Sequence, residues 1–117
     1  MSGYYKKLLN LTLILTFSFL SSFSSLSAEL SGEVMAKNPY NPNSFSLQDA
    51  RVDLYSVSPD GKFKLIDKSI TSSDGSYRFK GVKAGDYWIQ VNNKFNYEIS
   101  VSPKDVQKRA PLLVEIK

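Results

Sequence analysis

Apolar and polar residues alternate along most of the chain after residue 28, with the two-residue period of β-strands and no sustained helical period. The clearest example is residues 95–101, where apolar side chains occupy every second position. Residues 87–91 show the same alternation and place Trp88 and Gln90 on the side opposite to Tyr87. This pattern is typical of an antiparallel sheet that buries one face and leaves the other in water.

The alternation predicts seven short strands separated by turn sequences. These strands are expected over residues 29–37, 50–57, 62–71, 76–80, 87–91, 95–101 and 112–117. In the third strand the alternation slips between Leu65 and Ile66, which predicts a bulge or a bend. Two stacked sheets bury the apolar faces of such strands, so the sequence predicts an all-β fold, a small antiparallel seven-stranded β-sandwich of Ig-like architecture.

Two connecting segments are predicted to contain no strand. Residues 38–44 include Pro39 and Pro42 among several asparagines, which favours a polar loop. Residues 104–108 follow Pro103 and are predicted to form one helical turn.

Residues 1–27 follow a different pattern from the rest of the chain. A short basic start precedes an apolar run over residues 8–20, and a serine-rich stretch follows. These are the parts of a secretory signal peptide, so we expect cleavage after Ser27, or alternatively after Ala28, and an exported domain over residues 28–117 in the periplasm or outside the cell. A retained membrane anchor is the alternative, but the run is shorter than the ~20 residues that span a bilayer.

The composition removes several classes of chemistry. The 117 residues include no cysteine and no histidine. Disulfides, thiol catalysis and zinc-thiolate sites are therefore excluded, and so is the general base most often used near neutral pH. Loss of Lys6 and Lys7 with the signal peptide lowers the 15 basic residues to 13 against 11 acidic ones, and the net charge from +4 to +2. The remaining basic residues are scattered, so no nucleic-acid partner is expected.

One stretch carries a more specific pattern. Residues 70–91 contain a turn, an aromatic-x-aromatic strand, a corner and a further strand, marked by Asp74, Gly75, Tyr77, Phe79, Gly85 and Tyr87. This order resembles the signature of the carboxypeptidase regulatory-like domains and of their relatives, the collagen-adhesin B-type (Cna-B-like, prealbumin-like) repeats. Ser31-Gly32-Glu33-Val34 resembles their opening Gly-x-Val strand. The resemblance covers residues 30–102 and implies a prealbumin-like β-sandwich.

The signature residues have structural roles on such a sandwich. Tyr77 and Phe79 are expected to fill the core. Gly85 permits a corner that a β-carbon would crowd. Tyr87 is expected to turn its ring inward and to hydrogen-bond through its hydroxyl at that corner. These roles build a fold and supply no chemistry.

A candidate ligand-contact surface lies on the side of the predicted strand 87–91 that faces away from the core, where Trp88 points. Together with Tyr55 and Tyr40, Trp88 is a candidate aromatic platform for a sugar or a protein surface. The alternative is that Trp88 packs beneath the loop at residues 38–49.

Two other kinds of site have weaker support in the sequence. The collagen-adhesin relatives often carry an internal Lys–Asn or Lys–Asp isopeptide bond, which would here need Lys37, but residues 112–117 provide no Asn or Asp. Calcium needs six to eight oxygen ligands, whereas Asp60, Asp74 and Asp86 occupy separate turns. The sequence therefore predicts neither a metal nor a cofactor.

Catalysis would have to rely on carboxylates alone. The resemblance includes one small hydrolase type, but that activity uses histidines, and Asp53, Asp67 and Glu98 show no sign of converging. We therefore expect no enzyme but an exported binding module that docks onto an envelope or extracellular protein through its edge strands and the loop at 38–44. The alternative is a carbohydrate-binding module that uses Trp88 and a nearby tyrosine.

Overall fold

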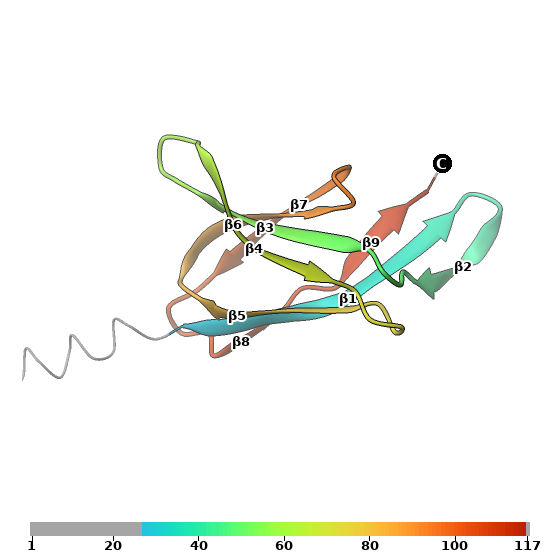
Figure 1. Cartoon of the computed structure of the whole chain (residues 1–117), viewed down its shortest axis with the longest axis horizontal. Helices are drawn as coiled ribbons and strands as arrows, with labels where there is room; N and C mark the ends of the chain where they lie inside the picture. The colour runs from blue at the N-terminus through green and yellow to red at the C-terminus, as the bar shows by residue number, and fades with distance from the viewer. Residues whose placement is uncertain (1–26, 117) are drawn as a thin grey trace, which may run out of the picture.

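The computed structural model describes residues 27–116, and in this range the chain forms nine strands and no helix. The strands are β1 (Ala28–Asn38), β2 (Asn41–Ser46), β3 (Arg51–Val57), β4 (Phe63–Ile70), β5 (Ser76–Val82), β6 (Gly85–Val91), β7 (Phe95–Val101), β8 (Gln107–Arg109) and β9 (Leu112–Glu115). They form two facing sheets (Figure 1). The described part of the chain has no helix that is long and apolar enough to cross a membrane. The predicted signal peptide, apart from Ser27, lies outside the described residues.

One sheet has four antiparallel strands in the order β4-β3-β6-β7. In the pairing of β3 with β6, Leu54 lies opposite Ile89 and Tyr55 lies opposite Trp88. Leu54 and Ile89 are buried against the second sheet, as the alternation predicts, so Tyr55 and Trp88 lie on the outer face.

The second sheet is built around the long strand β1. Its first half pairs with β5 and β8, and its second half pairs with β2 and β9. Every second residue of β1 from Ala28 to Ala36 points inward and is buried. The inner faces of the two sheets meet in one hydrophobic core, whose largest fully buried apolar side chains are Phe79, Leu30, Leu54, Ile89, Val34 and Val52. Full burial of each such side chain contributes about 1.5–3 kcal/mol to stability.

The structure corrects the predicted loop and the predicted strand count of seven. Residues Asn41–Ser46 form β2, which pairs with β1 in a hairpin. The backbone N–H of Tyr40 donates to the Asn38 Oδ1 atom at 3.0 Å within the turn. Pro42 is compatible with β2 because this strand pairs with β1 only, and an edge strand tolerates a missing N–H.

The predicted helical turn at residues 104–108 is wrong. Part of this segment belongs to β8, which runs parallel to β1, and β9 is also parallel to β1. The Glu29 N–H donates to the Val106 carbonyl at 3.0 Å, and the Ala110 N–H donates to the Ser31 carbonyl at 2.8 Å. These bonds give hydrogen-bond partners to backbone groups of β1. Because long-range backbone bonds hold β8 in place, its short polar sequence shows no periodic pattern of apolar residues. The predicted all-antiparallel pairing therefore holds for one sheet only.

The predicted irregularity in β4 is confirmed. Leu54 pairs with Asp67 and Tyr55 pairs with Leu65, so Ile66 is an extra residue on the β4 side. This insertion is a β-bulge, which bends and twists the strand locally.

The signature residues take most of the structural roles that the resemblance implies. Tyr77 and Phe79 are buried side by side, with ring centroids 5.8 Å apart. Tyr87 is buried, and its hydroxyl donates to the Lys83 carbonyl at the corner before β6. The expected reason for Gly85 is wrong, because a β-carbon there would lie 3.8 Å from the Tyr87 ring, an ordinary contact. Its φ of 153° is the feature that favours glycine.

Candidate functional site

The outer face of the four-stranded sheet carries three aromatic side chains that we call the aromatic patch: Tyr55, Phe63 and Trp88. Tyr55 and Trp88 are direct partners across β3 and β6. Phe63, at the start of β4, meets Trp88 edge to face, with ring centroids 5.2 Å apart and planes at 71°. The patch, with Gln90 and Asn96, lines an open hollow of about 260 Å³.

Polar groups border the aromatic patch. Gln90 donates from Nε2 to the Asn96 Oδ1 atom at 3.0 Å. Asp53, two residues before Tyr55 on the same face of β3, is 0% exposed and is paired with Arg51. Arg51 Nε lies 3.0 Å from both Asp53 carboxylate oxygens and donates to Oδ1, while Oδ2 has no hydrogen-bond partner within residues 27–116. The carboxylate thus lies beneath the surface and is not part of the hollow's lining.

The structure brings together two of the three aromatic residues that the sequence singled out. Tyr55 and Trp88 are neighbours, and the ring beside Trp88 is Phe63 rather than a residue of the 38–49 segment. Tyr40 is 94% exposed in the β1–β2 turn of the other sheet and does not line the hollow. Phe63 was missed because its strand lacks a continuous alternation, and only its place just after the turn at residues 58–61 could have indicated it.

Strand β4 is the edge of its sheet and exposes four large apolar side chains. Phe63 is 54% exposed, Leu65 39%, Ile66 44% and Ile70 61%. We call these four residues the β4 edge. The opposite edge strand, β7, has no large apolar side chain among the exposed ones of the described chain. Edge strands usually limit such exposure, because it invites pairing with another chain.

A groove opens between β4 and the other sheet. This β4–β5 groove has a volume of about 280 Å³ and is lined by Leu54, Ser56, Ile66, Asp67, Lys80, Gly81, Val82, Lys83 and Tyr87. Its floor is apolar, whereas Lys80 and Lys83 are exposed at its rim. Neither lysine forms an ion pair with another residue in the range 27–116.

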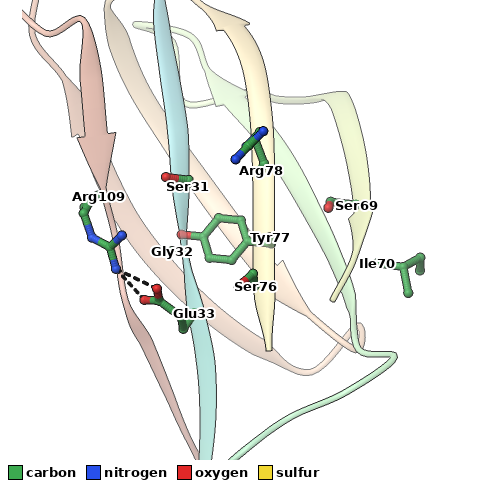
Figure 2. A pocket seen from close by; sticks show the side chains of 9 residues that line it. All are labelled: Ser31, Gly32, Glu33, Ser69, Ile70, Ser76, Tyr77, Arg78 and Arg109. Carbon is green, nitrogen blue, oxygen red and sulfur yellow. Dashed lines mark hydrogen bonds and ion pairs between the residues drawn. The ribbon is translucent and has the colours of Figure 1, made fainter. Parts of the chain in front are cut away.

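A third hollow lies beside β1, β5 and β8 and is shown in Figure 2. Arg109 faces Glu33 there and donates to both carboxylate oxygens, at 2.8 and 2.5 Å. Tyr77 donates to the Ala110 carbonyl at 2.5 Å, and its burial, with the nearby Glu33 charge, raises the pKa of its phenol. These charges and donors already have partners, so this hollow has the character of a structural network.

Of the three aspartates considered for calcium, Asp60 and Asp74 lie in separate turns, whereas Asp86 lies in strand β6 and not in a turn as expected. The Ser72 hydroxyl and the Ser76 N–H donate to the Asp74 carboxylate, and these bonds lower the pKa of Asp74 to about 2. Asp86 accepts a hydrogen bond from the Ser100 hydroxyl at 2.8 Å. No three acidic side chains gather closely enough to hold a metal ion within residues 27–116.

The structure also places the residues considered for an isopeptide bond and for carboxylate catalysis. Lys37 is exposed, and its ladder partner on β9 is Glu115. Asp53 is buried on the outer face of its sheet, whereas Asp67 lines the β4–β5 groove on the inner side. Glu98 is opposite Trp88.

Comparison with known proteins gives structural relatives only. No protein-family model matches the chain, and no curated protein matches it. Transthyretin from Sparus aurata superposes with a TM-score of 0.53 at 13% identity over 73% of this chain and 86% of transthyretin. The domain is a prealbumin-like β-sandwich.

Other structural neighbours of this chain are proteins of different kinds. A Pseudomonas aeruginosa protein suggested to bind carbohydrate matches with a TM-score of 0.54 at 13% identity, over 80% of this chain and 90% of that protein. (S)-allantoin synthase matches with a TM-score of 0.59 at 19% identity over 79% of this chain, which spans only 42% of the enzyme. The pilus 2b backbone protein of group B streptococcus matches with a TM-score of 0.56 at 10% identity over 76% of this chain and 41% of that protein. The major pilin subunit of Bacillus cereus also matches with a TM-score of 0.56, at 13% identity over 77% of this chain and 30% of that protein. At these identities the likeness establishes the fold alone.

Proposed function

We propose that this chain is an exported, non-catalytic binding module that docks onto a protein partner in the cell envelope or the extracellular space. A signal peptide over residues 1–27 would deliver the domain. The pilus backbone protein and the major pilin subunit among the structural neighbours support a surface role.

The exposed β4 edge is the observation that carries this proposal. Its four large apolar side chains lie on a strand with one open side, next to the aromatic patch. Burial of apolar area and pairing of edge backbone groups are the two main contributions that a docked protein chain can make. The surface is a better match to a protein than to a small substrate, because the hollow and the groove beside β4 in the described part of the chain are both open.

Recovery of a partner by two matched variants tests the proposal. Ile66 and Leu113 are both half-exposed strand residues, at 44% and 46%, but Leu113 belongs to β9 of the other sheet. Ile66→Asp should abolish co-purification of a partner from the native envelope or medium, while Leu113→Asp should leave it unchanged. Equal recovery by both variants, at equal folding by circular dichroism, would refute docking at β4.

A carbohydrate-binding module is the second candidate, favoured by a specific arrangement. The aromatic patch adjoins the hydrogen-bonded amides of Gln90 and Asn96, so apolar rings and polar groups share one hollow. Sugars present both kinds of surface, and the Pseudomonas aeruginosa neighbour is suggested to bind them. Glycan-array binding that is lost in Trp88→Ala would support this candidate, whereas co-purification of a protein insensitive to Trp88→Ala would support docking.

A further inference from the structure

We propose that β4 accepts an extended, acidic and apolar segment of the partner as an added β-strand. This proposal rests on the proposed function, because it gives the chemistry of the partner that docks at the β4 edge. Four features of the structure carry it: open backbone groups, apolar side chains on both sides of the strand, unpaired lysines, and a device that disfavours a second copy.

The first residues of β4 direct backbone groups away from the sheet. The Ser58 N–H donates to the Lys62 carbonyl at 3.0 Å, so this hydrogen-bonded pair lies directly beside the end of the β3–β4 ladder at Val57 and Phe63. Bonded and non-bonded pairs alternate along an antiparallel ladder. Lys64 is therefore the next bonded residue, and Phe63 and Leu65 direct their N–H and C=O groups outward. An added strand pairs with groups of this kind.

Apolar side chains accompany these backbone groups on both faces of the strand. Leu65 is the ladder partner of Tyr55 and lies with the aromatic patch on the outer face. Ile66 lines the β4–β5 groove on the other face, beside Leu54 and Tyr87. A strand added at this edge would cover apolar surface with alternate side chains on each face.

The groove side of this edge is positively charged. Lys64 pairs with Ser56 in the ladder, and Ser56 lines the β4–β5 groove, so Lys64 lies on the same side as Lys80 and Lys83. None of these three lysines forms an ion pair in the part of the chain that the structure describes, and Asp67 is the single acidic residue of the groove lining. Acidic side chains on the groove-facing positions of the added strand would complement this charge.

The same features disfavour a second copy of this chain as the occupant. A second β4 would bring its own lysines toward Lys64 and Lys68, and like charges directly opposite each other destabilise strand pairing. The bulge at Ile66 also interrupts a continuous register. Beyond it, the Asp67 side chain accepts the Lys68 N–H at 2.8 Å, so the open stretch is confined to the first half of β4.

Binding of two matched synthetic peptides tests the proposal. One decapeptide alternates glutamate with valine, and the other alternates lysine with valine. The full chain is expressed with its own N-terminal segment and with isotope labels. It is purified in the form that remains after any processing by the expressing cell. Only the glutamate peptide should bind, and the backbone amides that shift most in two-dimensional NMR should be those of residues 63–66.

A charge-reversed variant adds a second, independent prediction. Loss of the three exposed ion pairs that Lys64, Lys80 and Lys83 would form with the glutamate peptide should weaken its binding about tenfold. The variant carries Lys64→Glu, Lys80→Glu and Lys83→Glu, and it should gain binding of the lysine peptide. The matched control carries Lys94→Glu, Lys104→Glu and Lys108→Glu, away from β4, and should behave like the native chain.

Three results would overturn the proposal. These are absence of glutamate-peptide binding at millimolar concentration, equal binding of both peptides, and amide shifts centred outside β4. The proposed function fails separately, if Ile66→Asp leaves partner recovery unchanged. If partner recovery needs Ile66 but the glutamate peptide does not bind, docking at β4 stands and the acidic strand is refuted.

Discussion

At the scale of single residues, one glycine lets the C-terminal segment approach β1. A β-carbon at Gly32 would lie 2.3 Å from the Ala110 carbonyl oxygen and 3.0 Å from the Tyr77 ring. That same carbonyl accepts the hydrogen bond from the Tyr77 hydroxyl. The absence of a side chain at Gly32 therefore allows a core tyrosine to tie the segment between β8 and β9 to the sheet.

Gly32→Ala should therefore lower the free energy of unfolding by about 1–3 kcal/mol, because the added methyl group must displace backbone atoms. Ser31→Ala, at the neighbouring outward position, is the control and should stay within about 0.5 kcal/mol of the native chain. Urea denaturation measures both. Equal stability of the two variants would mean that the Ala110 carbonyl moves aside without cost.

The corner before β6 depends on a side-chain hydroxyl that the sequence already indicated. Removal of the Tyr87 hydroxyl in Tyr87→Phe leaves the Lys83 carbonyl without this donor and should cost about 1 kcal/mol. Tyr40→Phe changes an exposed tyrosine and should have no effect. Thermal unfolding compares the two, and identical melting temperatures would contradict the corner assignment.

The Asp74 turn makes stability depend on pH under acidic conditions. Its pKa is about 2 in the folded protein against the ordinary value of 3.8, because Ser72 and Ser76 donate to the charged form. A lowered folded pKa gives stability that is present above pH 3.8 and is lost as the pH falls toward 2. Asp74→Asn should therefore flatten the fall of unfolding free energy over this range, and a slope as steep as that of the native chain would exclude Asp74 as its source.

At the scale of elements, alternation was sufficient wherever a strand buries one face. The strands around Leu54, Ile89 and Phe79 were predictable because each has a continuous apolar stripe that must reach the core. Strands β2 and β8 were not, since they are held by backbone bonds to β1 and carry no such stripe. Tyr55 and Trp88 could be placed together from the sequence because their strands carry such an apolar stripe. Phe63 could not, because its strand lacks a continuous one.

The packing of Phe63 of β4 against Trp88 can be followed by fluorescence, because Trp88 is the single tryptophan of the chain. Phe63→Ala removes the ring that lies edge-on to Trp88, so the emission of Trp88 should shift to longer wavelength and become more accessible to acrylamide. Phe45→Ala changes an exposed phenylalanine of β2 in the other sheet and serves as the control. Unchanged emission in Phe63→Ala would place Trp88 in a different environment.

At the scale of the whole molecule, the two sides of the sandwich differ. On one side the Tyr97 hydroxyl of β7 donates to the Leu113 carbonyl of β9 at 2.6 Å and ties the two sheets together. On the other side β4 leaves apolar side chains and lysines exposed beside an open groove. Composition and net charge could not predict this asymmetry. It arises because the strand order of the four-stranded sheet places β4 at one edge and β7 at the other.

Site-specific photo-crosslinking in the native cells tests the central claim, docking through the β4 side, most directly. A benzophenone amino acid replaces Ile66 in one chain and Leu113 in another, two half-exposed apolar positions on opposite sheets. We expect a discrete crosslinked protein from position 66 and none from position 113, with the product lost when Lys64, Lys80 and Lys83 are changed to Glu. Crosslinking from position 113 alone, or equally from both positions, would contradict it.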